Sequence, residues 1–300
     1  MPLQRRPLGS GDAWVVGPDG RRFWGTYGAA GLLVAHPDAG VLLQHRAEWS
    51  HFGGTWGLPG GARHEGESAR DGAVREAAEE AGVPASGVRA RFLSLLDLGW
   101  WSYSTVVSTA DRFFEPAIGD LESIEVRWVS VAEVDDLPLH PGFAERWPSL
   151  RDQLFTDPVV VVDAANVVGS RPDGWWNDRA GAAARLVDAL LVLGDAGWPA
   201  EMLGLPHHVW WPRVQVVLEG DAKRMPDPHD SHDAAHPAIV RAAADGDSAI
   251  VECVATLPHP ETAIVITADR ALRERVSALG ATSGSPGALW RAIEAVVTQS

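Results

Sequence analysis

The sequence predicts an α/β protein with two domains. Its 300 residues exceed the usual size of one domain and are comfortable for two. The first half mixes strand and helix patterns, whereas residues 158–298 alternate strand and helix regularly, as a parallel sheet does. The rhythm changes at "FTDP", residues 155–158. We therefore expect one domain over residues 1–156 and a second over 157–300.

In the first half, two apolar runs around the turn "HPDAG" predict a hairpin of strands at 27–35 and 40–46. A helix is expected over 68–81, with Ser68 as its N-cap and Gly82 in the position that glycine favours after a helix. The remaining patterns predict strands and then a closing helix, at residues 91–100, 103–111, 125–131 and 142–154.

In the second half, "PVVVVDAANVVG" at 158–169 is a nearly continuous β-branched run, typical of a strand buried on both faces. Helices and strands then alternate over 179–197, 214–220, 247–257, 263–269 and 270–280. A polar loop is expected between them, and its His229, His232 and His236 have a spacing that a transition-metal site would also use.

Composition narrows the class of protein. The formal charge is −15, so neither half has the basic surface of a domain that grips nucleic acid through its phosphates. The single cysteine, Cys253, excludes an intramolecular disulfide framework and a multi-cysteine zinc site. No signal peptide or membrane-spanning run is visible, so we expect a cytoplasmic protein without a membrane partner. The sequence predicts no oligomeric state.

Acidic side chains crowd the predicted helix. Glu76, Glu79 and Glu80 are spaced i, i+3 and i+4 and share one helix face. Their repulsion is relieved when a hard cation such as Mg²⁺ binds their oxygen atoms. A solvated acidic face is the alternative for an isolated charge run. The surrounding pattern favours the metal, because Gly61, Glu67 and "REAAEEAGV" keep a fixed spacing.

That pattern resembles the Nudix box, G-x5-E-x7-R-E-U-x-E-E-x-G-U, and the resemblance covers roughly residues 20–155. It implies an α/β/α sandwich with a mixed sheet and Mg²⁺-dependent hydrolysis of a nucleoside diphosphate linked to another group, with Mn²⁺ as a substitute. By position, Glu76 and Glu80 would be the main metal ligands, with Glu79 and the Gly61 carbonyl near them. Arg75 would hold a glutamate in place and Glu67 would support the loop. A later carboxylate would act as base or ligand, for which Glu122 is the first candidate and Glu125 the second.

Substrate-binding candidates are less specific. Arg46, at the end of the second strand, would reach a phosphate, or would be a surface charge. Trp100, Trp101 and Tyr103 offer stacking surfaces for a base, although aromatic side chains in a strand are more often core. The sequence shows neither the proline of ADP-ribose-type members nor the downstream signature of NADH-type members. The broad class of nucleoside di- and triphosphates remains.

In the second half, Asp163 and Asp269 follow buried strands, where parallel sheets bind ligands, and Asp247 lies at a helix start, with Asp245 two residues before it. Asp247 and Asp269 also suit N-caps, and Asp163 also suits a turn. Together they resemble the NYN branch of the PIN-like nucleases, in which Asn166 belongs to the first motif. The resemblance implies a three-layer fold, and RNA cleavage with Mg²⁺ or Mn²⁺ held by Asp163, Asp247 and Asp269.

Two further residues qualify that resemblance. Asp178 is a candidate fourth acidic group. Ser248 stands where many relatives carry a second adjacent carboxylate, which makes efficient RNA cleavage doubtful.

The function expected first is Mg²⁺-dependent hydrolysis of a nucleotide diphosphate linkage. An RNA-processing protein whose C-terminal domain is the main nuclease is the alternative, with RNA as its partner. A non-enzymatic nucleotide sensor is a third, against which the complete set of glutamates argues.

Overall fold

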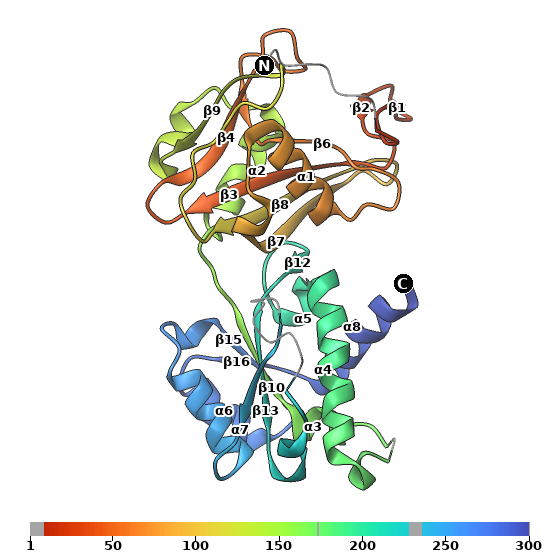
Figure 1. The fold of residues 1–300 in the computed structure, drawn as a ribbon, viewed down its shortest axis with the longest axis vertical. Helices are drawn as coiled ribbons and strands as arrows, with labels where there is room; N and C mark the ends of the chain where they lie inside the picture. Colours follow the sequence, from red (N-terminus) through yellow and green to blue (C-terminus); the bar gives the residue numbers. More distant parts are fainter. Residues whose placement is uncertain (1–8, 173, 228–235, 300) are drawn as a thin grey trace. The chain divides into compact units, whose positions relative to one another are not determined.

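The structure is a computed structural model that describes residues 9–172, 174–227 and 236–299 (Figure 1). It divides into two compact units, Met1–Phe155 and Thr156–Ser300. His229 and His232 of the predicted histidine loop lie outside the described residues. None of the helices in the described ranges combines the length and apolar character needed to span a membrane.

A mixed β-sheet forms the centre of the first unit. Its main path runs β7-β8-β3-β4-β5, with β6 paired to β3 and β9 paired to β4. The strands are β3 (Ala29–His36), β4 (Gly40–Arg46), β5 (Trp56–Gly57), β6 (Gly60–Ala62), β7 (Val88–Asp97), β8 (Ser102–Ala110) and β9 (Ser123–Val129). The predicted hairpin is confirmed, because β3 and β4 pair antiparallel with Ala35 opposite Val41. The mixed character comes from β3 and β8, which run parallel.

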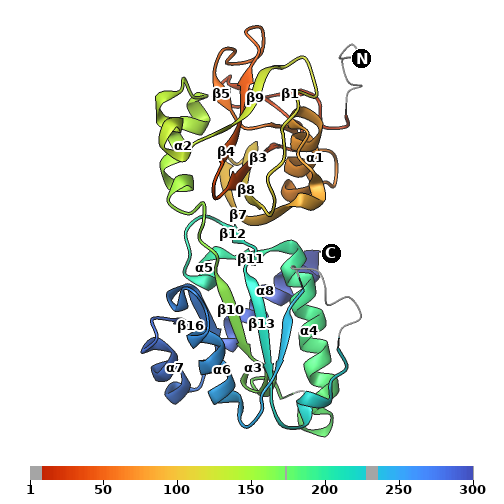
Figure 2. The ribbon, with the colours of Figure 1, turned by 60° about the vertical axis from the view of Figure 1, so that its left-hand side comes forward.

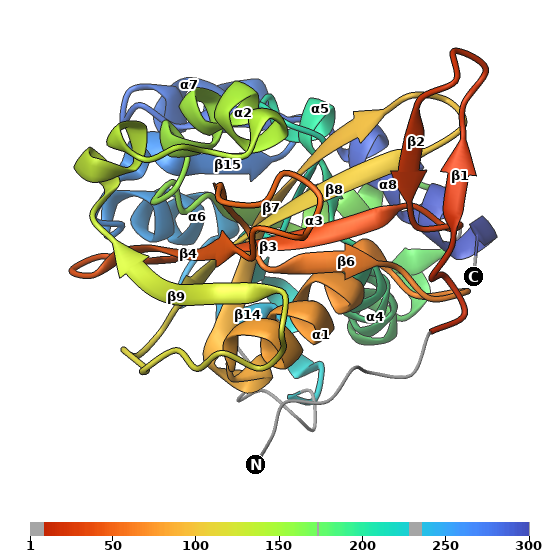
Figure 3. The same ribbon diagram turned by 90° about the horizontal axis from the view of Figure 1, so that it is seen from above.

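Two helices flank this sheet on opposite sides, α1 (Ala69–Ala81) and α2 (Pro141–Arg151) (Figures 2 and 3). The predicted ends of α1 are confirmed. Ser68 accepts a hydrogen bond from the Asp71 amide, and Gly82 follows the helix at φ 67°, a conformation that glycine adopts without strain. Alanines at 73, 77 and 81 are fully buried, so α1 approaches the sheet closely.

A short hairpin precedes the sheet. It consists of β1 (Trp14–Val16) and β2 (Arg22–Trp24), which form a separate two-stranded sheet with Trp14 opposite Trp24. Figure 3 shows this hairpin at one end of the first unit.

The second unit is built on a five-stranded sheet in the order β14-β13-β10-β15-β16, with every pair parallel. The strands are β10 (Val159–Asp163), β13 (Arg213–Leu218), β14 (Ala238–Arg241), β15 (Ala263–Ile266) and β16 (Thr282–Gly284). This confirms the predicted parallel sheet. The first strand, β10, is central. The chain adds β13 and β14 on one side of it and then β15 and β16 on the other, so the strand order reverses between β10 and β15. Ligands bind at the carboxyl ends of strands around such a reversal.

Helices cover both faces of the parallel sheet (Figure 2). On one face lie α6 (Gly246–Ala255) and α7 (Arg270–Ser277), which bury Ile250 and Leu272 against Val161 and Val265. The other face carries α3 (Ala164–Gly169), α4 (Arg179–Ala196) and α8 (Pro286–Gln299).

The predicted end of the first strand at Asp163 is confirmed, and the rest of the β-branched run at 158–169 forms α3. Shorter elements complete the described chain, namely β11 (Trp198–Pro199), α5 (Ala200–Leu203), β12 (Val209–Trp210) and the 3-10 helices η1 (Ala85–Gly87), η2 (Val131–Asp136), η3 (Trp175–Asn177), η4 (Gly220–Arg224) and η5 (Pro260–Thr262).

The domain boundary remains a prediction with a direct test. A fragment of residues 1–156 should be soluble and should unfold cooperatively, because the first unit has its own sheet and buried core. Circular dichroism during heating is the measurement. An insoluble fragment, or one that melts without a transition, would contradict the boundary.

Candidate active site

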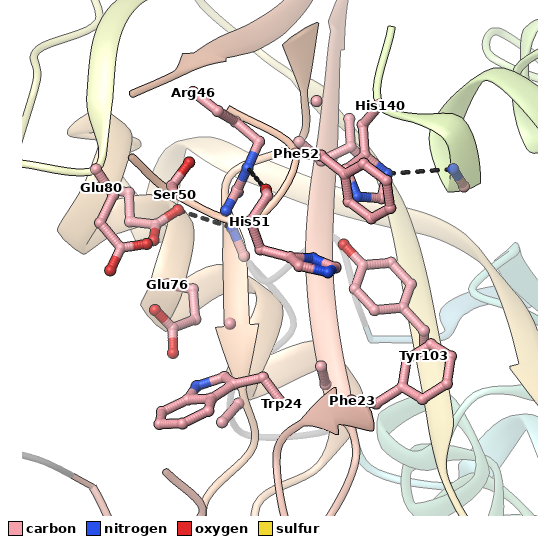
Figure 4. Close-up of a pocket in the computed structure, with 18 of the residues that line it drawn as sticks. Phe23, Trp24, Arg46, Ser50, His51, Phe52, Glu76, Glu80, Tyr103 and His140 are labelled. Atoms are coloured by element: carbon pink, nitrogen blue, oxygen red, sulfur yellow. Dashed lines mark hydrogen bonds between the residues drawn. The ribbon is translucent and has the colours of Figure 1, made fainter. Parts of the chain in front are cut away.

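A pocket of about 1190 Å³ opens in the first unit. One part is lined by carboxylates from α1 and from the segment before β9, including Glu76, Glu80 and Glu122. Aromatic side chains such as Trp24 and Tyr103 line another part, and Figure 4 shows these two kinds of side chain facing a common space. The predicted helix therefore delivers its glutamates to a cavity and not to a solvated surface.

The predicted metal ligands differ in burial. Glu76 and Glu80 are only 9% and 7% exposed, while Glu79 is half-buried. Glu80 Oε2 accepts hydrogen bonds from the Gly60 amide at 2.9 Å and from Gln44 Nε2 at 3.3 Å. Gly61 lies against Glu76, since a Cβ added at position 61 would come within 2.8 Å of its carboxylate. A larger residue at position 61 would push the Glu76 carboxylate from its present place.

Burial and like charges act together on Glu80. Burial, followed by the negative charges of Glu76, Asp120 and Glu122, raises the pKa of the Glu80 carboxyl well above its ordinary value. A group in this state gains from a nearby cation, and a set of carboxylate oxygens suits a hard divalent ion. Across the part of the chain that the structure describes, no three His, Cys, Asp or Glu side chains are already gathered for a metal ion. The glutamates are neighbours with the right chemistry, and their role as ligands stays a prediction.

Arg75 ties the loop before α1 to the helix itself. Its guanidinium donates to both oxygens of Glu67, at 2.7 and 2.9 Å, to Glu76 at 2.8 Å and to the Ala62 carbonyl at 3.0 Å. Hydrogen bonding to Arg75 holds the pKa of the Glu67 carboxyl below its usual range. Glu67 also accepts from the His64 amide at 2.9 Å. This geometry is the one expected for Arg75 holding a glutamate and for Glu67 supporting the loop.

Of the later carboxylates, Glu122 lines the pocket and is exposed. Glu125 does not line it and pairs with Arg127 at 3.2 Å. Asp120, which the sequence reasoning missed, also lines the pocket, and its negative charge raises the pKa of Glu80 more than that of Glu122 does. Its place in the sequence, two residues before Glu122, could have made it a candidate, although it belongs to no motif.

Three of the four predicted substrate-binding residues, Arg46, Trp101 and Tyr103, line the pocket. Arg46 Nε donates to the His51 carbonyl at 3.1 Å. Trp101 is 9% exposed and stacks on Phe23 with ring centroids 4.3 Å apart.

Trp100 lies outside the pocket, where its ring contacts Phe23 and Gly17. The structure therefore does not support Trp100 as a base-stacking residue. A single aromatic pair in the sequence gave no means of telling which ring turns inward.

The loop after β4 supplies pocket residues that the sequence analysis did not single out. His51 and Phe52 line the pocket together with His140, and their rings are in contact. Phe52 has φ 55°, an uncommon conformation for a residue with a side chain. Burial, and then the charge of Arg46, lowers the pKa of His140 to about 4. The His140 ring is therefore uncharged near neutral pH.

In the second unit, the predicted acidic residues mostly cap helices. Asp163, Asp178, Asp245 and Asp269 are the N-caps of α3, α4, α6 and α7, each accepting a hydrogen bond from a backbone amide. For Asp269 this is the N-cap alternative that the sequence left open, whereas the alternative for Asp163 was a turn residue. Asp247, in the first turn of α6, lies 3.6 Å from the guanidinium of Arg275.

Some of these carboxylates are also close enough for the charge of one to raise the pKa of another. Burial first, and then the charges of Asp247 and Glu219, raise the pKa of Asp163. The pKa of Asp247 is raised by burial and then by Asp269. Asn166 joins the same edge, because its side-chain oxygen accepts from the Ala268 amide at 2.8 Å. Glu219, the residue that follows β13, was not predicted, although it comes at the carboxyl end of a parallel strand as Asp163 does.

The low pKa of His140 has a measurable consequence. Since the folded-state pKa of about 4 lies below the ordinary value near 6.5, the folded protein loses stability as pH falls through this window, and the loss levels off below about pH 4. His140→Asn keeps a good N-cap for α2 but does not titrate, so its melting temperature should fall less between pH 7 and 4. Thermal unfolding at several pH values checks this. Equal slopes for both proteins would contradict it.

Comparison with known proteins gives matches in the first unit. The family model described as "NUDIX domain" matches residues 26–153. A Mycobacterium tuberculosis protein named "Putative 8-oxo-dGTP diphosphatase 3" is 48% identical over 165 residues, covering 52% of this chain and 76% of that protein. A "Nucleoside triphosphate pyrophosphatase/Nudix hydrolase fusion protein" of Bifidobacterium longum is 40% identical over 152 residues, which cover 48% of this chain and 32% of that protein.

Among solved structures, a Nudix hydrolase from M. smegmatis, RenU, is 47% identical, with a TM-score of 0.46, and covers 49% of this chain and 98% of that one. The family match ends at residue 153 and leaves the second unit without an identification, so its NYN/PIN-like assignment stays a prediction. The resemblance of the first half is confirmed: the chain belongs to the Nudix family, through a domain at residues 26–153.

Proposed function

We propose that the first unit hydrolyses a diphosphate linkage in a nucleoside di- or triphosphate, with Mg²⁺ or Mn²⁺ as cofactor. The observation that carries the proposal is the glutamate pair of α1, buried at one side of an open pocket whose other side is aromatic. A polyphosphate is the part of a substrate that suits a cation held by carboxylates, and an aromatic wall suits its base.

The residues present fit a divalent cation. Glu76 and Glu80 would hold it, with Glu79 and the Gly61 carbonyl at its edge. When bound, the cation would neutralise phosphate charge and lower the pKa of the attacking water. Fit is supported by the raised pKa of the Glu80 carboxyl, because its excess of negative surroundings is what a cation would relieve.

The remaining roles belong to the chain itself. Arg75 keeps Glu76 and the Gly61–Ala62 segment in place through its bonds to Glu76 and the Ala62 carbonyl. Glu122 is our candidate for the base that takes the proton of the attacking water, with Asp120 beside it. Arg46 would bind a phosphate oxygen, since it is the basic side chain at the end of β4 that lines the pocket.

For the substrate, the name of the M. tuberculosis relative indicates an oxidised purine nucleoside triphosphate. We propose 8-oxo-dGTP as the first compound to test, against dGTP, ADP-ribose and NADH. A pocket of about 1190 Å³ has room for a purine nucleotide.

Glu80→Gln should abolish hydrolysis while the fold remains. The change keeps the side chain's shape but removes an anionic ligand. Without metal, its melting temperature should rise slightly, because a buried charge repelled by Glu76 and Asp120 is gone. Assays at saturating Mg²⁺ and melting in EDTA measure both effects.

Glu125→Gln is the matched control for that prediction, since Glu125 lies outside the pocket and should retain full activity. Wild-type turnover in Glu80→Gln would contradict the assignment of this glutamate.

We propose a second activity for the second unit, metal-dependent cleavage of RNA. What supports it is a row of neighbouring carboxylates at the carboxyl edge of a parallel sheet, next to the reversal of strand order. Besides burial, the charge of Asp247 raises the pKa of Asp163, and the charge of Asp269 raises that of Asp247. In an RNA-processing protein, this unit would be the main nuclease. Cleavage should be slow, because Ser248 adds no carboxylate and the chain carries a formal charge of −15.

Asp247→Asn tests the metal site of the second unit. In a chain that also carries Glu76→Gln and Glu80→Gln, Mn²⁺ titrated by electron paramagnetic resonance should bind about 10-fold or more weakly after this change. Asp221→Asn, an exposed partner of Arg224, is the control and should leave binding unchanged. Equal Mn²⁺ affinity with and without Asp247 would contradict the metal site and leave Asp247 as an ion-pair partner of Arg275.

A further inference from the structure

The β1–β2 hairpin lies before residue 26, outside the segment that the NUDIX family model matches. It is nevertheless fixed to that domain. Phe23 stacks on Trp101 at 4.3 Å, and Trp101 Nε1 donates to the Trp24 carbonyl at 3.1 Å. Gly25, at φ 108°, lies against the Gly28 carbonyl, where a Cβ would come within 2.4 Å. The hairpin is therefore a positioned part of the first unit.

Two tryptophans of this hairpin line the pocket that contains the glutamates. Trp14 is 45% exposed and Trp24 is half-buried, and their rings meet edge to face with centroids 5.4 Å apart. Arg22 lies over Trp14 at 5.0 Å and helps to hold its ring. Figure 4 shows the Trp24 ring next to Glu76, across the open space from the Tyr103 side.

Two aromatic side chains of β8 and its preceding turn, Trp101 and Tyr103, are less available to a ligand. Trp101 is 9% exposed, and one face of its ring is taken by Phe23. The Tyr103 hydroxyl packs so tightly on Gly31 that a Cβ there would come within 2.2 Å. Trp49 and Phe52, from the loop after β4, line the pocket and are 62% and 45% exposed, but among the rings labelled in Figure 4 it is Trp24 that lies next to Glu76.

We propose that Trp24, supported by Trp14, stacks on the nucleobase of the substrate, so that a hairpin outside the matched domain determines base binding. This rests on the proposed nucleotide hydrolase function. A nucleobase is the occupant because one substrate must present a polyphosphate to the glutamates and a flat π-face to a ring beside Glu76. An apolar peptide would satisfy the tryptophans but would bring neither a cation nor a phosphate to the glutamates.

Calorimetric binding of guanosine 5′-monophosphate and ribose 5-phosphate tests the proposal, because the two probes differ only in the base. Trp24→Ala should weaken binding of the nucleotide about 10-fold and leave ribose 5-phosphate unchanged. Trp24→Phe keeps an aromatic face and should restore most of the loss. Trp14→Ala should have a smaller effect of the same kind. Val16→Ala, on the same hairpin, 64% exposed and outside the pocket, is the matched control.

In hydrolysis assays, Trp24→Ala should raise KM for a nucleoside triphosphate about 10-fold with little change in kcat, because the ring acts on the base and not on the reacting phosphate. The proposal is overturned if Trp24→Ala binds both probes as the wild type does, if it weakens both equally, or if the wild type does not favour the nucleotide over ribose 5-phosphate. A wild-type protein that binds guanosine 5′-monophosphate through Trp24 but hydrolyses no nucleoside di- or triphosphate would instead refute the proposed function and uphold the stacking role.

Discussion

The guanidinium of Arg75 is the group on which the geometry of the first unit's site depends. It is bonded at once to two glutamates and to a backbone carbonyl, so it joins the loop at Ala62 to Glu67 and to α1. Charge-assisted, bidentate bonds of this kind fix direction as well as distance. A lysine could not replace this arrangement, because an ammonium group lacks the planar fork that meets both oxygens of Glu67. The bond from Arg75 therefore holds the Glu76 carboxylate in its place next to Gly61.

Glu80 depends on different support. It is buried beside Glu76 and receives its hydrogen bonds from the Gly60 amide and from Gln44, a fully buried residue of β4. These two neutral donors do not balance its charge, which is why burial raises the pKa of Glu80 instead of being compensated. Arg75 satisfies Glu76, whereas within the described parts of the chain no guanidinium is bonded to Glu80 in the same way. The unequal treatment of two glutamates one helical turn apart identifies Glu80 as the residue with most to gain from a bound cation.

Much of the first unit was predictable because its signals are local. The Nudix pattern, Ser68 and Gly82 fixed the helix, and alternating apolar residues fixed the strands that pack on it. The pocket's aromatic wall was less predictable, since it depends on pairing between distant segments. Trp100 and Trp101 are adjacent in sequence, yet only Trp101 lines the pocket. A register shift between His45 and Arg46 likewise changes where Arg46 points, and irregularities of this kind are not encoded by a short sequence window.

The second unit shows the limit of reasoning from aspartates at strand ends. An aspartate after a parallel strand has two favourable uses, as the N-cap of the next helix and as a ligand at the sheet edge, and both require the same position. Asp163 already uses both oxygens, accepting from the Asn166 amide at 3.0 Å and from the Thr267 hydroxyl at 2.9 Å. Capping alone explains why Asp163 and Asp269 are there. It does not explain why, besides burial, the charges of Asp247 and Glu219 lie near enough to raise the pKa of Asp163, since a cap needs no second carboxylate beside it. That unfavourable proximity, more than the motif, is the physical reason to look for a cation in this unit.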